Sequence, residues 1–370
     1  MTSAQTYDIA IIGAGASGLQ LLYELIQADP SHEKKILLID SGDRSTKSWC
    51  FWEDKNASCF PFLVEKSWHS MTYRTSTGET IESPINPLQY NYISSDRFFD
   101  YFFNEFIPSN PNITHILGKA TEIHEGGDLH SVICEDASSF YAKRVADSRP
   151  LKSDDPTLIF QHFSGKFIEF EQPILDETSM TLMDFSLPAS TEEMAVFHYI
   201  LPFSKTKALI ETTVFTRLAY NKEAYERIWQ DYIETHYSSQ KFKILSNETG
   251  TIPMGGTTQK KEGRVFSIGA SGGNMKASTG YAFTRMHEDA KNRVLNLSKK
   301  KPKRFRFYDK MLLKIMQKEM IKIPAVMDRL FSRVQTPHIL RFLDDKSSLV
   351  DDIKLLSQLD IPLFIKHLLR

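Results

Sequence analysis

The feature that most constrains this chain is a glycine-rich turn between a short apolar run and a helix-like segment near the N-terminus. The apolar run at residues 9–12 leads into the letters GAGASG at 13–18, and leucines at helical spacing follow. A second apolar run, at residues 36–39, ends in Asp40. A strand, a glycine turn, a helix, a second strand and an acid in this order are typical of a dinucleotide-binding unit, in which Asp40 would accept hydrogen bonds from a ribose diol. A plain strand-turn-helix unit without a ligand is the alternative.

The residues of the turn suit this task physically. Gly13 permits the tight bend, Gly15 lets the backbone approach a pyrophosphate, and Gly18 lets the helix pack closely on the strand. The helix start supplies free N–H groups and a partial positive charge for phosphates. We therefore expect the turn to bind the cofactor, and we count Ala14 and Ser17 among its binding residues.

A second glycine-rich turn far along the chain decides which dinucleotide is expected. It follows a predicted strand at residues 263–268 and precedes a helix predicted to begin near Thr279. FAD folds use such a turn to hold the ribityl and flavin end, whereas NAD enzymes with one dinucleotide site do not need it. The sequence therefore favours FAD. The binding residues predicted here are Gly269, Gly272, Gly273 and Met275, with Arg97 from the first turn of a helix predicted from Ser95 or Asp96 to Phe106.

The middle of the chain predicts an antiparallel sheet, and the last seventy residues predict helices. The runs at 160–170, 180–185, 196–201 and 208–215 alternate or are rich in β-branched and aromatic residues. The expected fold is α/β, with a Rossmann-like FAD-binding domain of the glutathione-reductase or hydroxylase type, an antiparallel substrate domain and a C-terminal helical segment. The expected segments are 1–75, 113–156 and 249–298 for FAD binding, 76–112 for an excursion with a helix, 157–248 for the catalytic sheet, and 299–370 for a basic helical region.

One glutamate lies in a predicted strand with no good solvent-facing side. Glu211 shares its side with Leu209 and Phe215, and the opposite side is also apolar. Burial disfavours the charged form and raises a carboxyl pKa, so the side chain would stay protonated and be suited to acid catalysis. An exposed strand glutamate is the alternative. Asp184 presents the same question more weakly.

Bulk composition excludes several classes. A net charge of −1 argues against nucleic acid as the main partner. Three cysteines are too few and too irregularly spaced for a disulfide framework, and the eleven histidines form no ligand pair, so no metal is expected. We expect no signal peptide and no membrane span, and a reduced, cytoplasmic setting.

Charge is concentrated near the C-terminus. Residues 299–322 contain ten Lys or Arg against Asp309 and Glu319, interleaved with apolar residues. Such a segment can lie on an anionic membrane surface, or it can pack its apolar side on the body and solvate its lysines.

Several stretches together resemble the flavin-dependent lycopene cyclases of bacteria and plants. They cover most of the chain in the correct order, and SWCFWE and the glycine-STGY segment are much more specific than any dinucleotide motif. The segments are GAGASG at 13–18, SWCFWE at 48–53, LMDF at 182–185, LPFS at 201–204, LIETT at 209–213, IPM at 252–254, IGASGG at 268–273, STGY at 278–281 and LRFL at 340–343. One departure follows Asp184, where plant members carry Trp-Arg and this chain has Phe-Ser.

The resemblance implies an isomerase that closes the ψ-ends of lycopene or other acyclic carotenoids into β-ionone rings without net redox change. Glu211 matches the essential acid of the family, and Asp184 is included as a second catalytic residue. FAD, in a reduced form produced by NAD(P)H, would stabilise the cationic intermediate. Aromatic faces such as Trp49, Trp52 or Phe215 would contact the substrate, although the two tryptophans also fit an ordinary aromatic core. A hydrocarbon substrate stays in the bilayer, so peripheral association with the inner membrane through the basic C-terminal region is expected.

Two alternatives remain open at this point. One is an FAD-dependent monooxygenase or geranylgeranyl-type reductase of the same fold, and the other is a non-catalytic protein that binds FAD or carotenoid.

Overall fold

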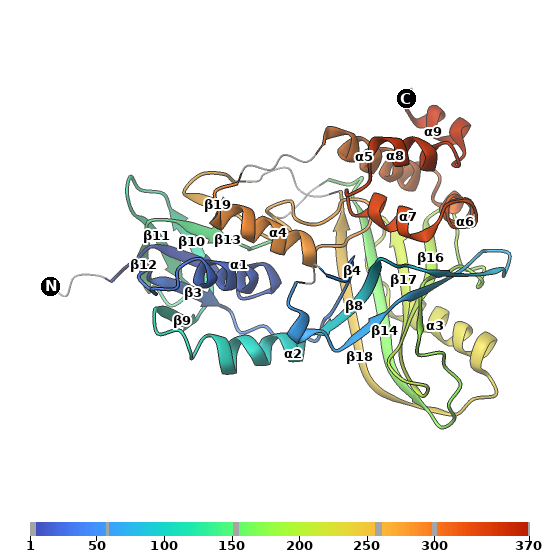
Figure 1. Cartoon of the computed structure of the whole chain (residues 1–370), viewed down its shortest axis with the longest axis horizontal. Coiled ribbons are helices and arrows are strands. Elements are labelled where there is room, and N and C mark those ends of the chain that lie inside the picture. The colour runs from blue at the N-terminus through green and yellow to red at the C-terminus, as the bar shows by residue number, and fades with distance from the viewer. Residues whose placement is uncertain (1–4, 57–58, 151–154, 256–260, 298–301, 369–370) are drawn as a thin grey trace.

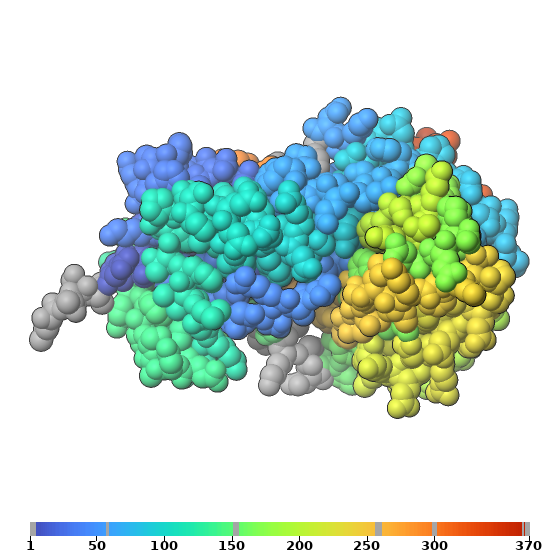
Figure 2. All heavy atoms as spheres, turned by 90° about the horizontal axis from the view of Figure 1, so that it is seen from below, coloured from blue at the N-terminus to red at the C-terminus, as the bar shows by residue number. Residues whose placement is uncertain are grey.

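The computed structural model describes residues 5–56, 59–150, 155–255, 261–297 and 302–368. It has a lobe built on a parallel sheet, a lobe built on a larger, mainly antiparallel sheet, and a layer of C-terminal helices over one end of the larger sheet (Figure 1). Seen from below, the two lobes fill the view and almost hide the C-terminal helices (Figure 2).

The first lobe is a five-stranded parallel sheet covered on both faces. Its strands, in spatial order, are β19 (Val265–Ser267), β13 (Val145–Asp147), β2 (Ile9–Ile12), β3 (Ile36–Asp40) and β9 (Ile113–Leu117). Every residue of β2 and β3 is buried, as expected for strands covered on both faces. Ile9 and Ile11 pack with helix α1 (Ala16–Gln27), whereas Ala10 and Ile12 pack against a second, four-stranded sheet. That sheet contains β1 (Thr6–Tyr7), β12 (Ser139–Ala142), β11 (His130–Cys134) and β10 (Ala120–His124).

The second lobe is a seven-stranded sheet, and the antiparallel strands predicted from alternation are confirmed. Its spatial order is β18 (Phe242–Met254), β14 (Ile159–Phe170), β17 (Lys207–Thr216), β16 (Met194–Pro202), β15 (Ser179–Asp184), β6 (Ser70–Arg74) and β7 (Thr80–Pro84). Only the β15–β6 pairing within it is parallel. Helix α3 (Lys222–Tyr237) packs on one face. A small sheet of β4 (Ser48–Asp54), β8 (Leu88–Ser94) and β5 (Lys66–Trp68) covers the other, together with the C-terminal helices.

Two predicted helix boundaries differ from the structure. The helix expected from Ser95 to Phe106 is α2 (Ser95–Asp100), continued by a π-helix (Tyr101–Phe106), and Ser94 caps it. The helix expected near Thr279 begins later, as α4 (Phe283–Val294). The STGY segment before α4 instead folds back as a turn, in which the N–H of Gly280, at φ 75°, donates to the carbonyl of Lys276.

The C-terminal region is helical, as predicted. Its helices are α5 (Lys303–Lys318), a 3-10 turn (Met320–Lys322), α6 (Ile323–Arg333), α7 (Thr336–Leu343), α8 (Leu349–Leu356) and α9 (Ile361–Leu368). The basic helix α5 buries Met311, Ile315 and Met316 against the body. The predicted basic residues Lys299, Lys300 and Lys301 lie outside the described residues.

The parallel sheet takes its strands from three separated parts of the chain. The excursion into the larger sheet starts before residue 76, because β6 already pairs with β7 and β15. The remaining segment boundaries stay a prediction.

Candidate functional site

The side chain of Glu211 points into the space between the seven-stranded sheet and the small sheet. It lies on the face of β17 that carries Leu209 and Phe215, both part of the largest apolar core. Glu211 is only 8% exposed although it is a carboxylic acid. The hydroxyl of Thr213 donates to its Oε1 at 2.7 Å. The sequence prediction that this glutamate is buried in an apolar strand is therefore confirmed.

A second carboxyl, Glu248 of β18, lies in the same cross-strand row. Strand β14, which lies between β17 and β18, pairs Gly165 with Glu211 on one side and with Glu248 on the other. Paired residues share a face of the sheet, so both glutamates project to the same side with only a glycine between them. A Cβ placed on Gly165 would stand 3.3 Å from the Cβ of Glu211, so the missing side chain leaves the room that these carboxyls use. Sequence analysis missed Glu248, because most of β18 is exposed and no local pattern marks this one position as buried.

Each of the two carboxyls makes ionisation of the other less favourable. Burial raises the pKa of Glu211, and the nearby charge of Glu248 raises it further, against the lowering effect of the Thr213 hydrogen bond. Burial likewise raises the pKa of Glu248, which accepts a 2.6 Å hydrogen bond from Ser48. Two neighbouring carboxyls in a dry site do not both ionise readily, so the pair holds a proton in the neutral range.

The small sheet supplies the roof over these carboxyls. Ser48, Cys50 and Trp52 alternate along β4 and face the larger sheet, where Ser48 binds Glu248 and Cys50 is hydrogen-bonded to Tyr199. Tyr199 is the β16 residue paired with Glu211, so it belongs to the same row. Desolvation raises the pKa of the half-buried Cys50 thiol, so it remains a neutral thiol.

Three tyrosines from separate elements meet at this roof. The hydroxyls of Tyr90 and Tyr199 are 2.7 Å apart, and those of Tyr90 and Tyr281 are 3.2 Å apart. The ring of Trp52 stands edge-on to that of Tyr281, with centroids 4.3 Å apart. The STGY segment that carries Tyr281 lies directly on the sheet, because a Cβ on Gly280 would meet Gln161 of β14 at 3.0 Å. The result is an aromatic, water-poor enclosure around a carboxyl pair.

The glycine turn after β2 has the geometry of a phosphate-binding loop. Gly13 has φ 93°, and a Cβ on Gly18 would lie 2.0 Å from the carbonyl oxygen of Gly13, so both positions need glycine. Nothing lies within 4 Å of a Cβ placed on Gly15, which leaves that side of the turn open. No side chain caps the start of α1, so its first N–H groups remain available to an anion. Asp40 lies at the same edge, where its Oδ1 accepts a 3.3 Å hydrogen bond from the N–H of Ala14.

The second glycine turn meets the first. A Cβ on Gly269 would lie 2.7 Å from the hydroxyl of Ser17 at the start of α1, so the two turns predicted to share a cofactor are adjacent. Gly272 packs against the backbone of Ile268, whereas Gly273 is exposed with open space around it and Met275 is half-buried. Arg97 is exposed on α2.

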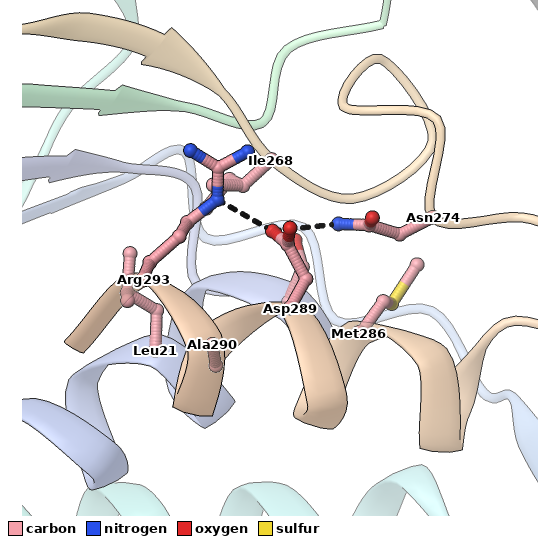
Figure 3. Close-up of a pocket in the computed structure, with 8 residues that line it drawn as sticks. Leu21, Ile268, Asn274, Met286, Asp289, Ala290 and Arg293 are labelled. Carbon is pink, nitrogen blue, oxygen red and sulfur yellow. Dashed lines mark hydrogen bonds and ion pairs between the residues drawn. The ribbon is translucent and has the colours of Figure 1, made fainter. Parts of the chain in front are cut away.

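A recess behind these turns, between α1 and α4, is not a ligand site. Asp289 fills it by accepting hydrogen bonds from Asn274 at 3.0 Å and from Arg293 at 2.6 Å (Figure 3). It leaves no space for a water molecule. Its polar groups instead fasten the second turn to α4.

Comparison with known proteins decides the family. The family model described as "Lycopene cyclase protein" matches residues 8–366, which is nearly the whole chain. The chain belongs to the lycopene cyclase family. The resemblance inferred from the sequence motifs is thereby confirmed.

Plant relatives agree with this membership at low identity. This lycopene cyclase family member is 24% identical over 300 residues to a chromoplastic capsanthin/capsorubin synthase of Citrus sinensis, covering 75% of the chain and 58% of the relative. It is 23% identical over 308 residues to the chloroplastic lycopene beta cyclase of Arabidopsis thaliana, covering 77% and 58%. The matches therefore span less than two thirds of the length of these relatives.

Solved structures of flavoproteins share the fold, as predicted. A geranylgeranyl bacteriochlorophyll reductase-like protein from Thermoplasma acidophilum matches with a TM-score of 0.66 at 11% identity, covering 98% of both chains. A flavin-dependent brominase matches with a TM-score of 0.61 at 12% identity, covering 92% of this chain and 94% of the other.

In this lycopene cyclase family member, Asp184 does not lie beside Glu211, the other residue predicted to be catalytic. A bulge between Thr181 and Asp184 shifts the register, and Asp184 pairs with His198 on the face under α3. There it is fully buried, and it accepts hydrogen bonds from Tyr232 at 2.7 Å and from Arg74 at 3.3 Å. These contacts link α3 to the sheet.

The three aromatic residues predicted to contact the substrate do not lie together. Trp52 lies in the roof, but Trp49 points to the opposite face of β4, where it packs on Phe98 and Phe283 in the core of the first lobe. The structure therefore does not place the two tryptophans around one ring system, because they are three positions apart on a strand. Phe215 shares the face of Glu211 but is four residues further along, roughly 13 Å away.

Two kinds of feature are absent from the residues that the structure describes. Within those ranges, no helix combines the length and apolar character needed to cross a membrane. In the same part of the chain, no three metal-binding side chains gather into one group.

Proposed function

We propose that this protein is a lycopene β-cyclase, which closes the ψ-ends of lycopene to β-ionone rings, via γ-carotene to β-carotene. The observation that carries the proposal is the buried pair of Glu211 and Glu248, set in one row between two sheets and roofed by aromatic rings. Family membership supports a carotenoid as the substrate, and the dry enclosure suits the protonation of a hydrocarbon double bond.

The pair supplies both proton transfers of such a reaction. Glu211, whose pKa is raised by burial and by its neighbour, donates its proton to the terminal double bond of the ψ-end. The resulting cation is attacked by the next double bond, so that a carbon–carbon bond closes the ring. A proton then leaves a ring carbon, and we assign its uptake to the ionised member of the pair, Glu248. One proton enters and one leaves, so nothing is oxidised or reduced.

The aromatic roof protects the cation without trapping it. Ring faces attract cations, and the rings of Trp52, Tyr90 and Tyr281 surround this space. The hydroxyl of Tyr90 is hydrogen-bonded to those of Tyr199 and Tyr281, and burial raises the pKa of each of the three phenols. They therefore stay neutral and present no phenolate that would capture the intermediate.

The paired glycine turns fit FAD. Gly13, Gly15 and Gly18 with the start of α1 would hold the pyrophosphate, with Ala14 and Ser17 beside them, and Asp40 would bind the adenosine ribose. The second turn would hold the flavin end through Gly269, Gly272, Gly273 and Met275, with Arg97 as a further contact. Reduced FAD, formed with NAD(P)H, would supply negative charge that stabilises a nearby cation.

Peripheral membrane binding follows from the substrate, because a C40 hydrocarbon remains in the bilayer. The basic helix α5 offers lysines for anionic lipid headgroups. Its own apolar side is buried, but Leu349, Val350 and Ile353 of α8 are exposed. We propose that these side chains provide the apolar part of the contact, and a liposome flotation assay with anionic lipids tests it.

The deciding experiment is expression in a lycopene-accumulating host followed by pigment analysis. The wild-type protein should convert lycopene to β-carotene, and Glu211→Gln should abolish ring formation while retaining FAD. Glu223→Gln, at an exposed position on α3, is the matched control and should remain active. β-Carotene formation by Glu211→Gln would refute the proposal.

The redox flavoenzyme folds found among the structural matches make a monooxygenase or reductase the second candidate. That function requires NAD(P)H consumption in proportion to product, whereas a cyclase needs its flavin reduced once. A non-catalytic FAD- or carotenoid-binding protein predicts that Glu211→Gln leaves pigment composition unchanged.

A further inference from the structure

We propose that an apolar pocket among the C-terminal helices holds the part of the linear polyene that extends away from the reacting end. This inference rests on the proposed function. It assigns a second site, separate from the carboxyl pair, that accepts a long apolar chain.

The pocket has a volume of about 420 Å³ and is lined from several helices. Leu312 of α5, Met327 and Leu330 of α6, Phe342 of α7 and Leu356 of α8 contribute to its wall. These helices lie together above one end of the larger sheet (Figure 1). The wall offers aliphatic and aromatic surface, which favours a hydrocarbon ligand.

The polar groups at the edge of the pocket are engaged with one another. Lys276 contacts both Asp309 and Asp345 at 2.6 Å, and the hydroxyl of Ser278 donates to Asp309 at 2.6 Å. Lys276 is 3% exposed, so its charge is neutralised inside the protein. A charged ligand would have to compete with these buried ion pairs, whereas a hydrocarbon leaves them intact.

The pocket is next to the carboxyl enclosure. Ser278 lines the pocket and Tyr281 belongs to the tyrosine roof, and three residues of chain span at most about 11 Å. On the other side, the indole N–H of Trp52 donates to the carbonyl of Leu340 at 3.0 Å, and Phe342 of the same helix lines the pocket. The pocket and the residues above the carboxyl pair are therefore neighbours, and the proposal has one polyene reach from the carboxyls into the helical layer.

The outer rim of the pocket is apolar and exposed. Phe307, Ile353 and Ile361 all line it, and they are 46%, 60% and 48% exposed. Exposed apolar side chains around an apolar pocket suit entry from a lipid phase rather than from water. We commit to the substrate chain, delivered from the bilayer, as the occupant.

A variant in which a larger side chain fills the pocket tests whether the pocket binds the polyene. Leu356→Trp places a larger ring in the pocket, and Lys354→Trp, on the same helix but exposed and away from the lining, is the matched control. Two measurements are made on the FAD-loaded proteins: binding of lycopene in detergent, followed by its absorption shift, and cyclisation of lycopene against a truncated acyclic analogue that keeps one ψ-end.

Leu356→Trp should weaken lycopene binding at least tenfold and slow its cyclisation, but it should leave the truncated analogue unaffected. Lys354→Trp should match the wild type with both substrates. Equal lycopene binding by Leu356→Trp and the wild type would overturn the assignment of this pocket to the polyene. Equal losses of cyclisation rate with both substrates in a folded variant would overturn it too. Leu356→Phe, a smaller change, replaces it if the tryptophan variant does not fold. If the wild type cyclises neither substrate, the proposed function fails instead.

Discussion

Gly165→Ala is the sharpest test of the geometry around the carboxyl pair, because it adds a single methyl group between Glu211 and Glu248. That methyl would lie 2.9 Å from Cδ1 of Leu209, and 3.3 Å and 3.4 Å from Cβ and Cγ of Glu211. These contacts are too short, so Leu209 and Glu211 must shift by a few tenths of an ångström. Neither acid is removed by the substitution, so any effect arises from position alone.

The expected loss of stability in Gly165→Ala follows from packing, and a control variant isolates this steric cost. Overpacking a buried position costs about 1–3 kcal/mol. Replacing glycine by alanine also stabilises by about 0.4–1 kcal/mol through the unfolded chain. Gly127→Ala shares that second effect, because Gly127 is exposed, has no positive φ and has nothing within 4 Å of an added Cβ. The difference between the two variants should therefore be the steric cost alone, about 1–3 kcal/mol.

The assay combines urea unfolding of both variants with cyclisation of lycopene in liposomes. We expect Gly127→Ala to unfold at or above the wild-type midpoint with normal turnover. Gly165→Ala should unfold at lower urea, and its turnover should fall roughly tenfold, since displacing a catalytic group by a fraction of an ångström costs part of the hundredfold expected for 1 Å. Indistinguishable stability and turnover in the two variants would refute the placement of Gly165 between the carboxyls.

Three further outcomes are expected. Because burial raises the pKa of Glu211 and Glu248, the folded state holds protons that the unfolded state releases; stability is therefore greatest below the ordinary glutamate pKa and falls as pH rises towards the raised values. Glu211→Gln removes roughly one buried carboxyl's contribution, so the free energy of unfolding should fall less between pH 5 and pH 9 than in the wild type. Denaturant titrations measure this, and parallel curves for the variant and the wild type would contradict it. Asp184→Asn should destabilise the protein by about 1–3 kcal/mol, because it weakens the hydrogen bonds from Arg74 and Tyr232 under α3. The activity per folded molecule should persist, and loss of activity in fully folded protein would support a catalytic role for Asp184. Gly18→Ala should reduce FAD retention at least tenfold, because the added Cβ would stand 2.0 Å from the carbonyl oxygen of Gly13 and force the turn to shift. The measurement is flavin content after gel filtration against Gly127→Ala, and equal flavin content would count against this turn as the pyrophosphate site.

Local sequence periodicity determined the parts of the fold that depend on neighbours along the chain. The glycine spacing after β2 predicted the turn and its helix, because Gly13 has φ 93° and a Cβ at Gly18 would lie only 2.0 Å from the carbonyl oxygen of Gly13. Apolar residues on both sides of β17 predicted that Glu211 is buried. The family motifs added the identity of that acid, which periodicity does not supply.

Tertiary structure decided everything that depends on strand register and on segments distant in sequence. Glu211 and Glu248 are thirty-seven positions apart in sequence and two strands apart in the sheet. They come together only because both pair with Gly165 of β14. Asp184 leaves the site through one bulge, which turns its side chain to the other face of the sheet. The pocket exists only where helices from the chain's end pack on the roof of a site built from its beginning and middle. Such pairings are non-local, so no window of sequence contains them, and the site becomes complete only when the chain is folded.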